Sequence, residues 1–164
     1  MAYTMKELLQ IMPQIGSVDW ISRRPAKRGI VESLKQIEVS EEDGLKGDHY
    51  GKKGGKRMVT LIQAEHIKTV ENILKKESID PKLLRRNIVV SGINLLALKD
   101  QVFQIGEVQL KMTGLCHPCS RMETNLGAGG YNAMRGHGGI TAKVVKGGMI
   151  RLGDEVKLLL QEIS

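Results

Sequence analysis

Apolar residues along the chain recur mostly in short runs bounded by glycine and polar residues, and seldom at helical spacing. Short runs rich in β-branched residues are typical of strands. Val108, Leu110 and Met112 alternate with polar residues, as on a strand with one buried face. Gly147 and Gly148 separate two such runs and predict a hairpin between them. The predicted strands cover residues 17–21, 30–39, 57–62, 88–90, 102–105, 108–112, 141–145, 149–152 and 156–160.

Patterns typical of helices are fewer than patterns typical of strands. Residues 63–76 carry apolar side chains at spacings of three and four, which predicts one substantial helix. Thr4 followed by Glu7 predicts a capped short helix near the N-terminus, and Asp80 before Pro81 predicts another. Many short strands with one substantial helix favour a mainly β fold with helical insertions, built as a closed or partly closed β-barrel. A doubly wound α/β fold would need strands and helices to alternate, and here they do not.

The length of 164 residues suits a single domain, and a composition of 41% hydrophobic and 26% charged residues is that of a globular protein. We expect a helical extension over residues 1–15 and a barrel core over residues 16–160. No apolar run approaches the ~20 residues that a membrane helix needs. Residues 1–12 lack the uninterrupted apolar stretch of a secretion signal, so a cytoplasmic location without membrane contact is expected.

The charge balance narrows the class of partner. Lys and Arg number 25 against 18 Asp and Glu, and the net charge of +7 favours an anionic partner, either nucleic acid or a phosphorylated small molecule. A basic β-barrel module for RNA or single-stranded DNA is one interpretation, and strong salt dependence would mark it. The chain has only five aromatic residues, whereas such modules stack bases on aromatic side chains. Nucleic acid is therefore the less favoured partner.

The segment with the most reactive residues is Cys116-His117-Pro118-Cys119, with Arg121 two residues further on. Thiolates are nucleophiles and soft metal ligands, and nearby positive charge lowers the pKa of a thiol. A zinc site would need two further ligands, and a redox pair normally opens a helix in a βαβ unit. Two buried structural cysteines or one working thiol in a ligand pocket are the other interpretations. The histidines available to complete a zinc site are His49, His66 and His137.

Cationic residues also accompany loops at three other places. Residues 44–57 and 135–140 are rich in glycine, and exposed backbone N–H groups beside Lys or Arg suit phosphate or another oxyanion. In residues 84–90, Asn87 lies where a predicted helix gives way to a strand, so its amide has an equally good role in satisfying the backbone of a turn. Each loop alone is a weak signal.

Taken in order, these segments resemble the MOSC domain, a family named for the C-terminal domain of molybdenum-cofactor sulfurase. The resemblance spans roughly residues 16–160 and implies a β-barrel of the type found in pyruvate kinase. It also implies a pocket linked to the molybdenum cofactor or to sulfur transfer, in a small stand-alone protein without a desulfurase domain. The segments that carry it are residues 44–49, 84–92, 105–106, 116–121, 136–139 and 153–154, together with Arg57.

The cysteine that marks this family falls on Cys119. In relatives this thiol is proposed to carry a persulfide or to ligate molybdenum, so the resemblance implies Cys119 as catalytic thiol and molybdenum ligand. It further implies reduction of N-hydroxylated substrates with a separate electron donor, and a desulfurase or reductase as protein partner. Pyridoxal phosphate is linked to the family only through such desulfurases, so none is expected here. The residues expected to bind the phosphate-bearing molybdopterin are His49, Arg57, Arg86, Asn87, Arg121, Arg135 and His137.

Overall fold

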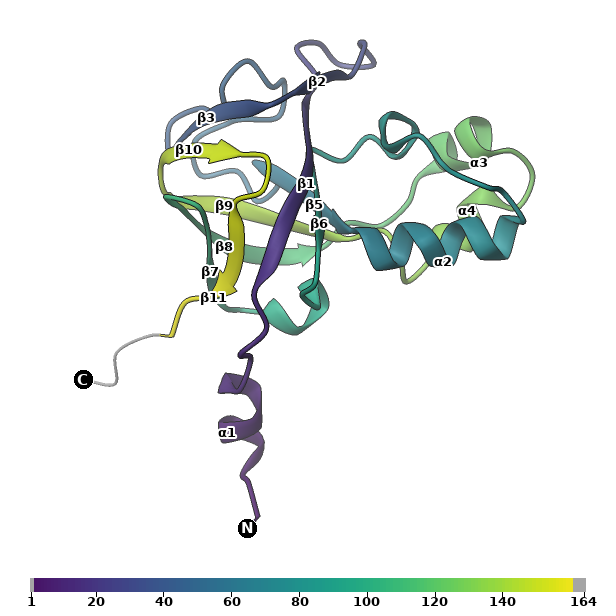
Figure 1. Ribbon diagram of the computed structural model, residues 1–164. Helices are drawn as coiled ribbons and strands as arrows, with labels where there is room; N and C mark the ends of the chain where they lie inside the picture. Colours follow the sequence, from purple (N-terminus) through teal and green to yellow (C-terminus); the bar gives the residue numbers. More distant parts are fainter. Residues whose placement is uncertain (1, 161–164) are drawn as a thin grey trace.

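Short strands and helices follow one another over residues 2–160, the part of the chain that the computed structural model describes (Figure 1). The strands are β1 (Gly16–Arg23), β2 (Glu32–Leu34), β3 (Gln36–Ser40), β4 (Gly44–Leu45), β5 (Val59–Gln63), β6 (Ile88–Ser91), β7 (Val102–Ile105), β8 (Val108–Leu115), β9 (Ile140–Lys146), β10 (Gly148–Arg151) and β11 (Glu155–Leu158). The α-helices are α1 (Met5–Gln10), α2 (Ala64–Leu74), α3 (Ser120–Leu126) and α4 (Gly130–Met134), and the 3₁₀ helices are η1 (Pro81–Leu84) and η2 (Leu95–Leu98).

Seven of the strands within residues 2–160 close into a barrel. They follow one another in the order β11-β7-β8-β9-β5-β6-β1, and β11 pairs with β1 as well as with β7. Strand β2 continues the sheet beyond β1, while β10, β3 and β4 form a second, smaller sheet. The mainly β, closed barrel predicted from the short apolar runs is therefore confirmed.

Two hydrophobic cores share the barrel wall. Leu61 on β5 and Ile88 on β6 point into the barrel, whereas Ile62 and Val89 belong to a separate core outside it. That outer core lies against α2, α3 and α4, which gather on one side of the barrel (Figure 1). Because both faces of β5 are covered, all five of its residues are buried.

The hairpin predicted across Gly147 and Gly148 is wrong. Strand β9 already has β8 and β5 as its two neighbours, so neither edge is free for β10. The chain instead crosses to the small sheet, where β10 pairs antiparallel with β3. A Cβ on Gly147 would collide with the backbone of Val39, so the glycine permits this close crossing.

Other predicted elements appear with shifted bounds. The Thr4–Glu7 capping box begins α1, and Asp80 caps η1. The predicted strand over residues 30–39 is split into β2 and β3, and α4 has no counterpart among the predicted elements. Strands β5 and β6 are parallel, so α2 and η1 form the crossover of one βαβ unit. No helix within residues 2–160 has the length and apolar character needed to cross a membrane.

Candidate functional site

The two cysteines lie on the segment that joins β8 to α3, and their environments differ. Cys116 is 2% exposed, whereas Cys119, the residue before α3, is exposed. The Cys116 N–H donates to the Gly139 carbonyl oxygen at 2.8 Å, and its sulfur lies 3.7 Å from Nη2 of Arg57. Of the two thiols, only that of Cys119 is open to a ligand or a partner.

The geometry of this segment bears on the redox-pair interpretation. Residues 116–119 include no helical or turn residue, and Pro118 favours an extended conformation at His117. Both cysteines are free thiols, so no disulfide joins them. Within the described residues there is also no cluster of three or more His, Cys, Asp or Glu side chains able to hold a metal ion. Within residues 2–160 the two thiols are therefore unlinked, and no side-chain cluster of the kind that holds zinc surrounds them.

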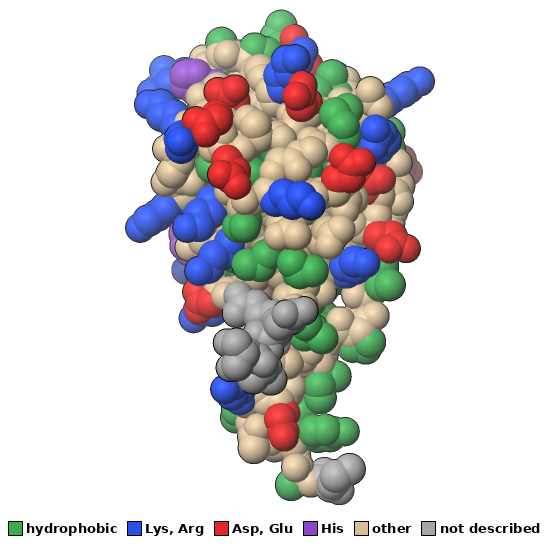
Figure 2. Space-filling view, turned by 90° about the vertical axis from the view of Figure 1, so that its left-hand side faces the viewer, with side chains coloured by type: hydrophobic (Ala, Val, Ile, Leu, Met, Phe, Trp, Pro, Cys, Tyr) green, Lys and Arg blue, Asp and Glu red, His purple; other side chains and the backbone are tan. Residues whose placement is uncertain are grey.

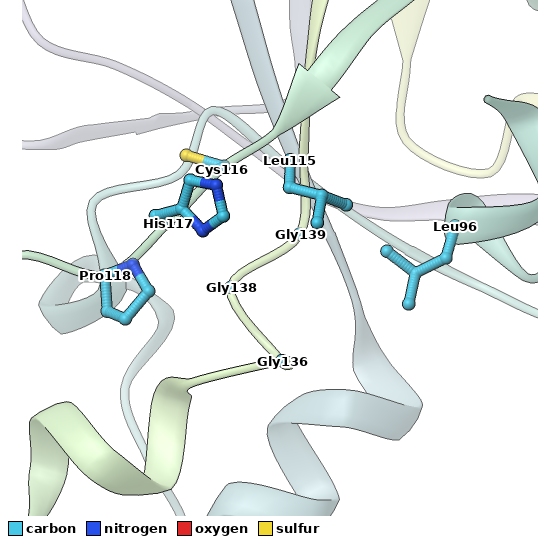
Figure 3. A pocket seen from close by; sticks show the side chains of 8 residues that line it. All are labelled: Leu96, Leu115, Cys116, His117, Pro118, Gly136, Gly138 and Gly139. Carbon is cyan, nitrogen blue, oxygen red and sulfur yellow. The ribbon is translucent and has the colours of Figure 1, made fainter. Parts of the chain in front are cut away.

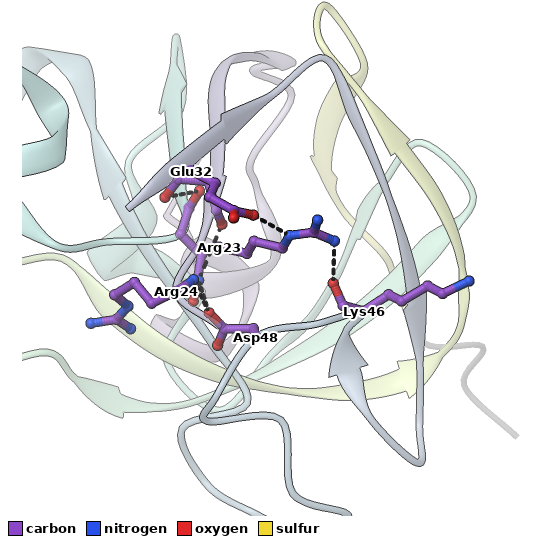
Figure 4. Close-up of polar contacts among 7 residues, drawn as sticks. Arg23, Arg24, Glu32, Lys46 and Asp48 are labelled. Carbon is purple, nitrogen blue, oxygen red and sulfur yellow. Dashed lines mark hydrogen bonds and ion pairs between the residues drawn. The ribbon is translucent and has the colours of Figure 1, made fainter. Parts of the chain in front are cut away.

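A buried arginine lies near this segment. Arg23 and Arg24 follow one another at the end of β1, but their side chains point in opposite directions (Figure 4). Arg23 forms an ion pair with Glu32 at 2.8 Å, whereas Arg24 is only 8% exposed and its Nε has no hydrogen-bond partner. The Arg24 guanidinium carbon lies 4.7 Å from the centre of the Tyr50 ring, a cation–π contact.

Three guanidinium groups gather here without carboxylate partners. None of the ion pairs within residues 2–160 includes Arg24, Arg85 or Arg121. Burial lowers the pKa of Arg85, and the charges of Arg121 and Arg24 lower it further, whereas Tyr50 and Cys119 act in the opposite direction. Burial likewise lowers the pKa of Arg24, and the charge of Asp48 opposes that effect, although a guanidinium stays protonated in proteins. This arginine cluster, Arg24, Arg85 and Arg121, is a concentration of positive charge within electrostatic reach of Cys119.

Arg86 ties the surrounding segments together. It is 6% exposed, and its guanidinium donates to the carbonyl oxygens of Gly138 at 2.7 Å, Leu84 at 3.0 Å and Cys116 at 3.3 Å. Burial lowers the pKa of Arg86, and the nearby Cys116 opposes that effect. The Cys116 segment, the end of η1 and the glycine loop before β9 are thus held by one side chain.

Asn87 anchors the loop before β5 in a similar way. It is 1% exposed, and its Oδ1 accepts from the Thr60 N–H at 3.0 Å. Its Nδ2 donates to the Asp48 carboxylate and to the Ser22 carbonyl oxygen, each at 3.3 Å. The same carboxylate accepts from the Arg24 N–H at 2.8 Å, so this network fixes the backbone from which Arg24 projects.

A crevice of about 180 Å³ lies beside the cysteine segment (Figure 3). Leu96 and Leu115 form its apolar sides, and Pro118 and the glycine loop complete it. A Cβ on Gly138 would collide with the Cys116 carbonyl oxygen, and one on Gly139 with the Leu61 carbonyl oxygen. Glycine at these two positions therefore lets the loop pack directly on the cysteine segment and on β5.

Of the other arginines predicted to bind the cofactor, two lie near the cysteine segment or the arginine cluster and one does not. Arg57 is exposed and reaches the Cys116 sulfur, and the half-buried Arg121 belongs to the arginine cluster. Arg135 is exposed, and its guanidinium donates to Oδ1 of Asn132 on α4 at 3.3 Å. Arg135 thus has no contact with the cysteine segment among the hydrogen bonds and ion pairs of residues 2–160.

The two histidines predicted to bind the cofactor, His49 and His137, lie in different parts of the structure. His49 is exposed, contacts Tyr50 edge to face at 5.1 Å, and donates its backbone N–H to the Arg24 carbonyl oxygen at 2.7 Å. His137 lies 5.3 Å from the ring of His66 on α2, and its Nδ1 is 3.0 Å from the Ala133 carbonyl oxygen. His49 therefore borders the arginine cluster, whereas His137 supports the glycine loop from the helical side.

Sequence reasoning missed Arg24, Arg85 and Tyr50. Arg85 and Tyr50 lie inside the segments 84–90 and 44–57 but were not named as binding residues, and Arg24 follows the first predicted strand, outside every segment singled out. What the sequence could not supply is orientation, because Arg85 has a left-handed backbone, with φ of 57°, at the end of η1. That turn directs Arg85 toward the Gly29 carbonyl oxygen, 3.3 Å away, while Arg86 points into the interior.

Comparisons with known proteins bear on the family and on the fold. Residues 46–157 match the family model described as MOSC domain. The YuaD protein from Bacillus subtilis superposes with a TM-score of 0.77 at 17% identity, covering 90% of this chain and 97% of that one. YiiM from Escherichia coli gives 0.66 at 14% identity, covering 90% and 72%, and YiiM from Geobacillus stearothermophilus gives 0.69 at 13%, covering 88% and 75%. No curated protein matches the sequence.

Proposed function

Because this chain belongs to the MOSC domain family, we propose that Cys119 is its reactive thiol and that the neighbouring arginine cluster binds the phosphate of the molybdenum cofactor. The observation that carries the proposal is the exposed thiol beside three guanidinium groups that lack carboxylate partners, one of them with a buried, unpartnered Nε. A buried cation is costly unless something neutralises it. An anionic ligand at this place supplies that neutralisation.

The residues present fit the cofactor. Molybdopterin is anionic through its phosphate and its dithiolene sulfurs, and a guanidinium binds phosphate with two parallel hydrogen bonds. Thiolate is a soft ligand suited to a sulfur-bound metal. When bound, the cofactor supplies a redox-active metal centre for reducing N-hydroxylated substrates, with electrons from a separate donor.

The chain's own residues divide into binding and positioning roles. Arg24, Arg85 and Arg121 hold the anion, His49 borders them, and Arg57 lies against the Cys116 sulfur. Arg86 and Asn87 have their polar groups engaged within the protein, so they act by fixing the backbone of the cysteine segment and of Arg24. Arg135 and His137 lie toward the helical side and remain predicted contacts only.

Persulfide carriage is the second candidate for the same thiol. The exposure of Cys119 favours it, because a partner that loads or unloads sulfur must reach the thiol directly. A desulfurase would be that partner, whereas a reductase would be the partner of a molybdenum enzyme.

The two cysteines provide the test. Replacing the thiol of Cys119 with a hydroxyl, Cys119→Ser, is expected to abolish molybdenum retention and persulfide formation, since serine is neither a soft ligand nor readily ionised. Molybdenum by elemental analysis, oxidised-pterin fluorescence and cyanide-labile sulfur are measured on freshly purified wild type and variant. Molybdenum with pterin in the wild type supports the cofactor, and labile sulfur without either supports the persulfide.

Cys116→Ser is the matched control. This thiol is buried against Arg57, so the variant should lower stability modestly and keep molybdenum or sulfur at the wild-type level. If both variants lose the ligand equally, the thiols act together. If the wild type holds neither molybdenum nor labile sulfur, or if Cys119→Ser retains them, Cys119 is not the reactive group.

A further inference from the structure

The sulfur of Cys119 is the thiol of this chain that a dissolved molecule can reach. Cys119 is exposed, whereas Cys116 is buried, and both are free. The Cys119 side chain forms no capping hydrogen bond to α3, so the helix that follows it does not occupy the sulfur. An accessible free thiol of this kind can exchange with a disulfide in solution.

The arginine cluster beside this thiol has N–H groups left for an anion. Arg24 is 8% exposed and its Nε has no partner, and the Arg85 guanidinium donates only to the Gly29 carbonyl oxygen among the hydrogen bonds of residues 2–160. The Asp48 carboxylate attracts Arg24, but its two oxygens already accept hydrogen bonds from backbone N–H groups and from the Asn87 amide. The cluster therefore still has capacity for a carboxylate from outside the chain.

This unpaired charge is not a general property of the surface. On the face shown in Figure 2, the Lys and Arg side chains lie among Asp and Glu side chains, so charges of opposite sign are mixed there. Burial also limits what can reach the cluster, because Arg85 and Arg121 are half-buried and Arg24 is almost fully buried. A carboxylate on a small, flexible molecule can reach such groups, and a guanidinium binds it with two parallel hydrogen bonds.

We propose that Cys119 is reversibly modified by low-molecular-weight disulfides that bear carboxylates, which the arginine cluster selects by their charge. The inference takes the thiol and the cluster from the proposed function but needs no cofactor. The Cys119 thiolate attacks one sulfur of the disulfide, and a new S–S bond joins that half of the molecule to the protein. The other half leaves as a thiolate with the electron pair and takes up a proton. Cys119 is thereby oxidised, the leaving half is reduced, and excess free thiol reverses the step.

The modification closes the site in two ways. A sulfur that is part of a disulfide offers no thiolate to a metal or to a second sulfur atom. The carboxylate held by the arginine cluster also takes the place of a phosphate. The mixed disulfide is therefore an off state of the site, and a free thiol restores the active state.

Exchange rates with disulfides of opposite charge test the selection. The Cys116→Ser variant has Cys119 as its single thiol, and mass spectrometry of the intact protein follows its reaction with anionic glutathione disulfide and with cationic cystamine. Each rate is divided by the rate for the same variant unfolded in urea, where the cluster is dispersed. The folded protein should favour the anionic disulfide by about tenfold or more at low salt, and by less at high salt.

Substitutions in the cluster should reduce this preference. Arg121→Gln and Arg85→Gln should each lower it about threefold or more, because each removes one cation near the thiol. Arg23→Gln is the matched control and should leave the preference unchanged, since Arg23 is paired with Glu32 and points away from Arg24 (Figure 4). Circular dichroism confirms that each variant is folded, and peptide mapping of the modified wild type should place the adduct on Cys119.

Three results would overturn the proposal: equal normalised rates for the two disulfides, an adduct on Cys116 in the folded wild type, or a preference that persists in both arginine variants. These results are separable from the proposed function. A protein that holds neither molybdenum nor labile sulfur but shows the charge preference keeps the modification site and loses only the cofactor or sulfur-carrier role. A protein that retains molybdenum without the preference keeps that role and loses the modification site.

Discussion

Arg24 places a positive charge where the fold alone gives it little compensation. Its backbone N–H is bonded to Asp48, whose charge also favours the guanidinium, but the side chain forms no ion pair, lies over the face of the Tyr50 ring and has an unpartnered Nε. A cation–π contact contributes about 0.5–2 kcal/mol, less than the several kcal/mol that burying an ion costs. Such a residue is typical of a binding site that sacrifices stability of the free protein.

Arg24→Met should therefore separate binding from stability. The variant removes a buried charge while keeping the apolar stem, so thermal unfolding should show an unchanged or higher Tm. Affinity for inorganic phosphate, followed by chemical-shift titration, should fall roughly tenfold to a hundredfold through loss of a charge-assisted hydrogen bond.

Arg23→Met is the matched control at the neighbouring position. Its partly exposed pair with Glu32 is worth at most about 1 kcal/mol, so stability should fall slightly and phosphate affinity should not change. Unfolding of Arg24→Met together with unchanged phosphate binding would show that Arg24 is structural.

At the scale of elements, the glycine loop before β9 is fixed by steric contact. Gly139 has φ of +87°, and a Cβ there would collide with the Leu61 carbonyl oxygen on β5. Gly139→Ala should cost at least about 2–3 kcal/mol, a fall in Tm of roughly 5–10 °C, measured by thermal unfolding. Gly136→Ala, with φ of +81° but open space around its Cβ, should cost only about 1–2 kcal/mol. An equal loss of stability in the two variants would mean that β5 shifts and makes room for the added methyl group.

Helix α2 supports this loop through a histidine contact that depends on pH. Burial lowers the pKa of His66, the charge of His137 lowers it further, and Glu65 opposes both. The unfolded chain then binds more protons than the folded one, so stability should be full above about pH 6.5 and should decline as the pH falls below it. His66→Gln should flatten that decline in Tm, whereas His49→Gln, on the exposed segment before Tyr50, should retain it. A wild-type Tm that is constant across this range would contradict the role of the pair.

The elements themselves were largely predictable, and their pairing was not. Alternating or β-branched runs located β7, β8 and β11 because each packs one face on the core. The β9–β10 hairpin was mispredicted because turn residues report local geometry, whereas pairing depends on which strand edges are already occupied. Helix α4, with five residues between glycines, is too short for a periodic pattern to show.

Part of the site could be predicted in the same way. Cys119 and the basic loops were evident because their chemistry is local, but the inward direction of Arg24 was not. A bulge between Val18 and Trp20 shifts the register of β1, so simple alternation cannot say which arginine turns inward. The closeness of Arg24 to Arg85 depends on the pairing of β1 with β6, which joins segments 61 residues apart.

For the whole molecule, the positions of the aromatic residues bear on the nucleic-acid interpretation. Trp20 packs against the outer core, Tyr50 is covered by Arg24, and Tyr131 lies on α4. Bases stack on neighbouring exposed rings, and these three are on separate elements with different surroundings. These three rings therefore do not form one shared platform on which bases could stack.

Closure of the barrel by the first and last strands also affects how the protein is made. Gly16 pairs with Val156 and Ser17 with Glu155, so the closing contacts join residues about 140 positions apart. Contacts between such distant residues form slowly, because a long loop must be ordered first. During synthesis on the ribosome, the edge of β1 that pairs with β11 consequently stays unpaired until β11 has been synthesised. A nascent chain that stalls before residue 155 exposes that edge to other chains, which makes late translation the stage most exposed to aggregation.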